Sequence, residues 1–197
     1  MNRRALLSLL GAAALLVSAA AAVAENATER LSVPGPISFH GESFALSWAS
    51  HPYPHYYKQE YLPAGQDSEH YRAMVLLDAN IAEGDVRAAA AATVDMLQKR
   101  KATDPLVNFS QIVNRKTGEI IVDFIMSSPD GDIVEWNAYR YAPWTGEGGK
   151  AGVVLFGISR RAYGDDATAF LASLKAARPA DIDALASAPM PAVVLKE

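Results

Sequence analysis

Histidine and tyrosine side chains that could take part in chemistry are concentrated in one part of this chain. All 4 histidines lie between His40 and His70, and imidazole can act as a general base or bind copper and zinc. Tyrosines in the same window offer ring faces for apolar contact and hydroxyls for hydrogen bonding, as ligand clefts do. We therefore expect a ligand-binding or partner-binding surface formed by His51, Tyr53, His55, Tyr56, Tyr57, Tyr61 and His70, with Trp144 on a neighbouring loop.

Other interpretations of the same residues stay open. Tyrosines are common in strands, so they could simply cover a half-exposed sheet. His51, His55 or His70 could be the general base of a small hydrolase or isomerase, supported by an Asp or Glu. The histidines could also form a periplasmic copper or zinc site. Two prolines interrupt the backbone between His51 and His55, and no Cys or Met stands at ligand spacing beside them, so we expect no metal ligand.

Motifs for nucleophilic or phosphate chemistry are absent from the sequence. There is no Gly-x-Ser-x-Gly, no Ser-x-x-Lys, no His-Glu-x-x-His and no cysteine, and the glycine-rich stretch 146–149 has no phosphate-loop pattern. The paired carboxylates at 130 and 132 and at 165 and 166 fit a turn and a helix start. We expect no catalytic residue and no cofactor, and a binding or accessory role rather than turnover.

The first 24 residues have the pattern of a cleavable signal peptide. Arg3 and Arg4 precede an apolar run from Ala5, and Ala22-Val23-Ala24 is a small-x-small cleavage site. An uncleaved membrane anchor is the alternative, and the arginine pair leaves both the Sec and the twin-arginine route open. With no cysteine there is no lipid-attachment site. We therefore expect a periplasmic or secreted protein without stable membrane insertion after cleavage.

Charge and length narrow the class of partner. The net charge is −4, and the loss of residues 1–24, which contain two arginines and no acids, makes it −6, so nucleic acid is an unfavourable partner. The mature length suits one domain that needs no partner chain to form a core. We expect a monomer or weak oligomer that contacts an envelope protein or a small ligand.

The hydrophobic pattern predicts the elements that must position these residues. Residues 25–36 should form a flexible arm, followed by two short strands at 37–48 in which Trp48 alternates in phase with Phe44 and Leu46 and is therefore buried. Further strands are expected at 56–62, 71–78, 107–114, 119–126, 132–141 and 151–160.

Two helices complete the prediction. The first should begin after Asp85 as its N-cap and end near Lys101, and the second should begin at Asp165 or Asp166 and end at Pro179. Strands and helices in this order predict an α+β domain over residues 37–178, an antiparallel β-sheet with two main helices packed on one face. Residues 179–197 should form a tail with at most one short helix.

This order of elements, over about residues 36–178, resembles the fold shared by the photosystem II oxygen-evolving extrinsic protein, the Ran-binding nuclear transport factor and small envelope lipoproteins. Phe44-Ala45-Leu46-Ser47-Trp48 resembles the first long strand of that fold, and the stretch 58–66 is similar to a segment of an uncharacterised exported bacterial protein family. Members of that fold are mostly accessory or binding proteins, so the resemblance implies a binding role and assigns no functional residue.

Overall fold

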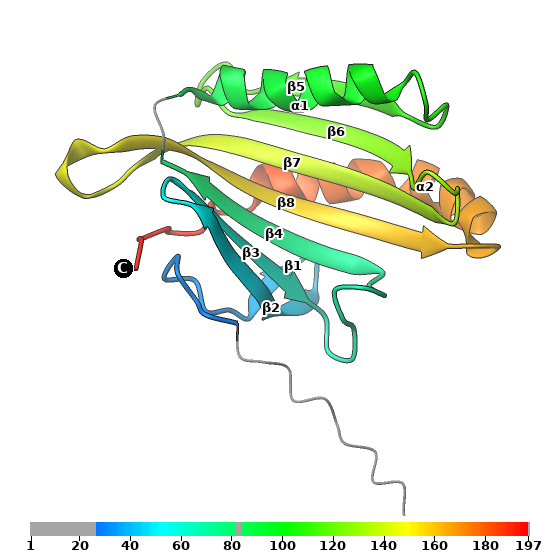
Figure 1. Cartoon of the computed structure of the whole chain (residues 1–197), viewed down its shortest axis with the longest axis horizontal. Helices are drawn as coiled ribbons and strands as arrows, with labels where there is room; N and C mark the ends of the chain where they lie inside the picture. The colour runs from blue at the N-terminus through cyan, green and yellow to red at the C-terminus, as the bar shows by residue number, and fades with distance from the viewer. Residues whose placement is uncertain (1–26, 82–83, 197) are drawn as a thin grey trace, which may run out of the picture.

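The computed structural model describes residues 27–81 and 84–196, and the expected signal peptide at 1–24 lies outside them. Eight strands form one curled antiparallel sheet in the order β1-β2-β3-β4-β8-β7-β6-β5 (Figure 1). The α+β fold with an antiparallel sheet is therefore confirmed. The strands are β1 Ile37–Phe39, β2 Glu42–Tyr53, β3 Tyr56–Leu62, β4 Ala73–Asn80, β5 Asn108–Val113, β6 Ile120–Ser127, β7 Ile133–Thr145 and β8 Ala151–Tyr163, with a short 3-10 turn at Glu147–Gly149.

The two helices, α1 (Val86–Arg100) and α2 (Asp166–Ser187), lie on opposite faces of the sheet. Successive strand residues point to opposite faces, and in β6 Ile120 packs with α1 whereas Ile121 packs with the residues of α2. Figure 1 shows α1 in front of the sheet and α2 behind it. The predicted packing of both helices on one face is therefore wrong, because the order of elements along a sequence does not say which face each helix covers.

Helix α1 begins and ends as the sequence predicts. The Asp85 carboxylate accepts a hydrogen bond from the Ala88 backbone N–H at 2.8 Å, and Lys99 and Arg100 occupy the last turn, where the helix dipole favours cations. Its buried residues Val86, Ala90 and Leu97 pack on β6 and β7. The helix consequently covers only the β5-β6-β7 side of its face of the sheet.

Helix α2 continues through Pro179, where the sequence predicted its end, and runs to Ser187. A proline inside a helix removes one backbone hydrogen bond, so tertiary contacts must offset that cost. Arg178 donates to the buried Asp123 carboxylate, and Leu185 is fully buried. Arg140 donates to the Leu185 and Ala188 carbonyl oxygens at 2.8 and 2.7 Å, which satisfies acceptors at the end of the helix.

Trp48 is 41% exposed, so the prediction that it is buried is wrong. The pairing of β2 with β3 shifts between Leu46, opposite Tyr61, and Trp48, opposite Glu60. A β-bulge of this kind moves later side chains to the other face of the sheet. The Lys58 ammonium lies 5.8 Å from the centre of the Trp48 ring.

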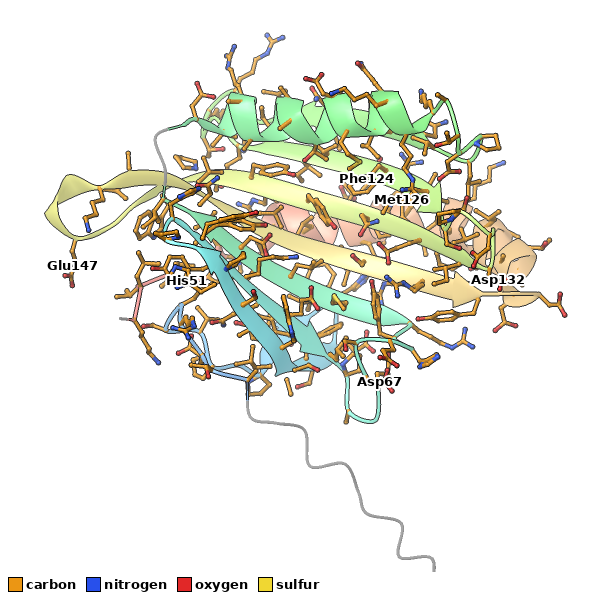
Figure 2. All side chains as sticks on the ribbon, in the orientation of Figure 1. His51, Asp67, Phe124, Met126, Asp132 and Glu147 are labelled. Carbon is orange, nitrogen blue, oxygen red and sulfur yellow. The ribbon has the colours of Figure 1, made fainter. Side chains whose placement is uncertain are left out.

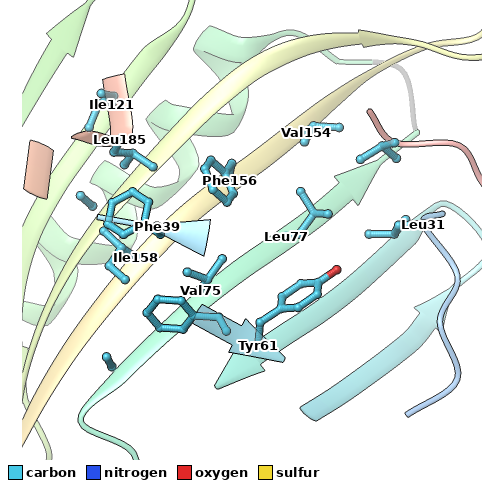
Figure 3. Close-up of a cluster of buried hydrophobic side chains, with 14 of the residues drawn as sticks. Leu31, Phe39, Tyr61, Val75, Leu77, Ile121, Val154, Phe156, Ile158 and Leu185 are labelled. Carbon is cyan, nitrogen blue, oxygen red and sulfur yellow. The ribbon is translucent and has the colours of Figure 1, made fainter. Parts of the chain in front are cut away.

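The largest core lies between α2 and the sheet and includes both terminal segments (Figure 3). Leu31, in the expected flexible arm, is fully buried, and the Gln59 side-chain oxygen accepts hydrogen bonds from the Arg30 and Leu31 backbone N–H groups. Val194 donates to the Leu31 carbonyl oxygen and Lys196 to that of Arg30. These bonds hold the first and last described segments side by side on the sheet. Within the described ranges, neither helix is long and apolar enough to cross a membrane.

Candidate functional site

The residues expected to form one binding surface are distributed over both faces of the sheet. Tyr61 is fully buried on the α2 face, where its hydroxyl donates to the Val33 carbonyl oxygen at 2.6 Å. Tyr57 is buried on the same face, with the His51 ring stacked on it at 4.0 Å between centroids. Tyr56, one residue earlier, points to the α1 face, because neighbouring strand residues alternate.

The other members of that expected surface fall into separate groups. Tyr53 is 61% exposed and stacks on His55, with ring centroids 6.0 Å apart. His70 lies in the loop between β3 and β4, 3.6 Å from the Asp67 carboxylate, and Figure 2 shows His51 and Asp67 at different ends of the sheet. Trp144 is half-buried, and its indole N–H donates to the Val193 carbonyl oxygen. Trp144 and Tyr57 line one cavity of about 440 Å³, but the structure does not bring the expected residues together into one site.

A cavity of about 400 Å³ lies between α1 and the sheet, and most of the residues that line it were not among those expected from the sequence. Its floor comes from β3, β4, β7 and β8, and α1 closes one side. The cross-strand pairing places Tyr56 opposite Asn80 and Lys58 opposite Asp78 in this floor. The lining residues are Tyr56, Lys58, Leu76, Asp78, Asn80, Ala89, Ala92, Thr93, Tyr139, Tyr141, Val153 and Leu155.

Asp78 is the buried carboxyl group in this cavity. Its Oδ2 accepts a hydrogen bond from the Tyr56 hydroxyl at 2.5 Å, whereas its Oδ1 is buried and has no hydrogen-bond partner within residues 27–81 and 84–196. Burial raises the pKa of Asp78 to about 6, although Lys58 and the Tyr56 hydroxyl favour its charged form. A buried polar atom without a partner costs free energy, so it needs an explanation.

Lys58 does not satisfy this carboxyl oxygen. Its ammonium lies 3.7 Å from a carboxylate oxygen of Glu60, two residues along β3. Burial raises the pKa of Glu60, while Lys58 lowers it. The single lysine in the cavity wall therefore faces two carboxyl groups, Glu60 and Asp78.

Tyrosine rings form the wall on β7. The Tyr141 hydroxyl lies 2.7 Å from the Thr93 hydroxyl of α1, and burial raises the Tyr141 pKa to about 12. The Tyr139 ring packs edge-on against Phe124 with centroids 5.0 Å apart. Its own pKa is also raised by burial, so both phenols stay protonated at neutral pH and can donate hydrogen bonds.

A second buried carboxyl group on the α1 face of the sheet, that of Glu135, is fully paired. Glu135 accepts hydrogen bonds from the Tyr71 hydroxyl at 2.6 Å, from Arg161 at 2.7 Å and from Asn137 at 3.0 Å. Asn137 in turn accepts from the Ser159 hydroxyl. Each member of this network has a hydrogen-bond partner, so its contribution to the fold is enough to explain why it is there.

A larger cavity of about 680 Å³ lies on the other face, against α2, and its charged groups are also paired. Asp181 contacts His40 at 3.0 Å and Arg160 at 3.2 Å, and Arg160 also contacts Glu42. Arg72 pairs with Asp166 at 2.9 Å. The apolar part of the wall comes mainly from alanines, Phe170 and Leu174. This cavity therefore offers no unsatisfied charge to a ligand.

The described ranges, 27–81 and 84–196, contain no group of three or more His, Cys, Asp or Glu side chains placed to hold a metal ion. The α1 cavity instead combines apolar side chains with three tyrosines, the polar side chains of Lys58, Asn80 and Thr93, and the Asp78 carboxyl group. Such an arrangement can bind a small ring-bearing molecule through one polar group.

Asp78 was missed at the sequence level because it ends a run that looks apolar from Ala73 to Leu77. One signal was available: Met74, Leu76 and Asp78 occupy alternate positions of a strand that is buried on both faces, so the carboxyl group had to point into the interior. Tyr56 was the one expected site residue that lines this cavity.

Comparison with known proteins gives one match. A family model matches residues 31–190, which span β1 to α2 and include every residue of the α1 cavity. No curated protein and no solved structure matches the chain. The chain belongs to an uncharacterised protein family.

Proposed function

We propose that this protein binds a small molecule in the cavity between α1 and the sheet, and that its role is binding rather than turnover. The observation that carries the proposal is the Oδ1 atom of Asp78, which is buried and has no partner in the described part of the chain. A ligand that donates a hydrogen bond there would satisfy it. The cavity volume of about 400 Å³ lies within the range of small-molecule sites.

The chemistry of the walls supports the same proposal. Apolar side chains of α1, β4 and β8 face tyrosines of β3 and β7, so a ring would be in contact on most sides. A few polar groups in a mainly apolar wall fix the orientation of a ligand. The resemblance of the order of elements to folds of accessory and binding proteins agrees with this role.

A histidine-based hydrolase or isomerase has less support. His51 and His55 stack on tyrosines, and His70 and its neighbour Asp67 are both largely exposed in a loop. A general base needs a concave site around the reacting atom, which an exposed loop does not provide.

We also propose that binding takes place outside the cytoplasm, because residues 1–24 have the pattern of a cleavable signal peptide. Expression in a Gram-negative host should yield a periplasmic protein whose first residue lies within about two residues of Glu25. Recovery of only full-length protein in the membrane would contradict this.

The cavity can be tested with two matched variants. Ala92 of α1 lines the proposed site and Ala177 of α2 lines the larger cavity, and both are exposed helical alanines. A fragment library screened by ligand-observed NMR should give binders that Ala92→Trp weakens at least tenfold and that Ala177→Trp leaves unchanged. Binders that lose affinity only with Ala177→Trp, or with neither variant, would overturn the proposal.

A further inference from the structure

We infer that the ligand of the α1 cavity is an organic amine whose ammonium group binds the Oδ1 atom of Asp78. This inference rests on the proposed function and specifies its ligand class. Three observations support this inference: the charges of the cavity, the carboxyl oxygen without a partner and the aromatic side chains around that oxygen.

Charge is the first argument. The charged side chains at the cavity are Lys58 in the wall, Asp78 opposite it and Glu60 next to it on β3. The residues of β7, β8 and α1 that line the cavity carry no charge, and Arg161 and Glu135, which also act on Glu60, form an ion pair whose charges cancel. With both carboxyl groups ionised the local charge is −1, so the site favours a cation over a neutral or anionic ligand.

The geometry of Asp78 specifies the group that is missing. Its Oδ2 already accepts from Tyr56, so the carboxyl oxygen that lacks a partner is Oδ1, and because Oδ1 is buried, a ligand reaches it when the Asp78 carboxyl group turns toward the cavity. An ammonium group donates up to three hydrogen bonds and forms a charge-assisted one with a carboxylate. A ligand carboxylate would place a second negative charge beside Asp78 and provide no donor.

The aromatic side chains are the third argument. Tyr56, Tyr139 and Tyr141 all line the cavity. A cation over the face of a tyrosine ring is attracted by the ring quadrupole, and the attraction is stronger where water is excluded. The apolar side chains Leu76, Val153 and Leu155 are then available for the hydrocarbon part of the amine.

The probes are three matched series of small compounds: aryl- and cyclohexyl-methylamines, the corresponding alcohols and the corresponding carboxylates. Dissociation constants are measured by ligand-observed NMR or calorimetry on the mature protein at pH 7.5 and pH 5. At pH 7.5 the best amine should bind at least tenfold more tightly than its alcohol, and no carboxylate should bind. The amine should weaken several-fold at pH 5, because Asp78, with a pKa of about 6, becomes protonated while the amine stays charged.

Variants assign the effect to one carboxyl group. Asp78→Asn should weaken the amine at least tenfold, remove most of its pH dependence and leave the alcohol within about threefold, whereas Glu60→Gln should retain the pH dependence, because Glu60 already has Lys58 as its partner.

Failure of this inference can be told apart from failure of the proposed function. Alcohols that bind as tightly as amines, with sensitivity to Ala92→Trp, would overturn the amine and leave the cavity as a ligand site. Amine binding that is insensitive to both Asp78→Asn and Ala92→Trp would overturn both. If no amine of the series binds at pH 7.5, the amine inference is wrong, and the fragment screen then decides the proposed function alone.

Discussion

Two buried carboxyl groups on opposite faces of the sheet, those of Asp123 and Asp78, differ in how completely they are paired. On the α2 face, Asp123 accepts hydrogen bonds from the Trp136 indole at 2.6 Å and from the Ser110 hydroxyl at 2.8 Å, and it pairs with Arg178 of the helix. On the α1 face, Asp78 has one tyrosine partner and one unpartnered oxygen. A carboxylate with every acceptor satisfied contributes to holding a helix on a sheet. One that is left incomplete, as Asp78 is, marks the place where we propose that a ligand binds.

The comparison predicts its largest effect on the free energy of unfolding, when each of the two carboxylates is replaced by an asparagine amide. Asp123→Asn should lower the free energy of unfolding by about 3 to 5 kcal/mol, because a neutral amide with one acceptor oxygen replaces a carboxylate that accepts from Trp136, Ser110 and Arg178, and buried donors such as the Trp136 indole N–H lose a charge-assisted hydrogen bond. Asp78→Asn at pH 7 should be neutral or stabilising, since it removes a poorly paired buried charge. Urea unfolding monitored by circular dichroism measures both, and equal losses would contradict the comparison.

The pH dependence of stability sharpens the result for Asp78. Its pKa is about 6 in the folded protein against an ordinary value of 3.8, so the folded state holds this proton more tightly than the unfolded state. Its contribution to stability is therefore fully present below pH 4 and is lost as the pH rises through 6. The free energy of unfolding of the wild type relative to Asp78→Asn should fall by about 2 to 3 kcal/mol between pH 4 and pH 7, at 1.36 kcal/mol per pKa unit. Urea melts at several pH values that gave parallel curves would show that Asp78 does not titrate in this range.

Tyr56→Phe should have a smaller effect. The change removes the one hydroxyl that donates to Asp78 and leaves both carboxyl oxygens without a partner, which should cost about 1 to 2 kcal/mol at pH 7. In the Asp78→Asn background the cost should be lower, because a neutral amide is less expensive to bury than a carboxylate. A double-mutant cycle from urea melts measures this difference, and strict additivity would show that the two side chains do not interact.

The smallest effect is expected at Trp48. Because its ring is 41% exposed, Trp48→Ala should cost about 1 kcal/mol or less, far below the 3 to 5 kcal/mol typical of a buried aromatic residue. Tyr61→Ala, at a fully buried position, is the contrasting variant and should cost about 3 to 5 kcal/mol. If the two variants melt alike in urea, Trp48 is buried and the shifted pairing in β2 is contradicted.

Local signals predicted much of the fold. The Asp85 cap, the end of α1 near Lys101 and the three strands predicted at 107–114, 119–126 and 132–141, which are β5, β6 and β7, appear where the sequence indicated them. Features that depend on tertiary contacts were not predictable in this way. The bulge that exposes Trp48, the contacts that carry α2 through Pro179 and the face that each helix covers all involve residues distant in sequence.

Dependence on residues that are distant in sequence also explains why the candidate site was not predicted. Tyrosine and histidine attract attention because their side chains are versatile, yet the chemical character of Asp78 comes from the residues around it. Tyr56 is 22 positions earlier in the chain, and Thr93 and Tyr141 are brought to the same cavity by a helix and a distant strand. A carboxyl group at an inward position of a doubly buried strand was the one local sign of this site.

The pairing of the two terminal segments also has a mechanical consequence. Val194 donates to Leu31 and Lys196 to Arg30, so the pairing is antiparallel, and residues 30 and 196 lie at the same end of it. A force that pulls these two segments apart therefore loads one hydrogen bond at a time and opens them in sequence. Resistance to pulling from the ends must then come from the six inner strands, β2, β3, β4, β8, β7 and β6, each of which has a hydrogen-bonded neighbour on both sides.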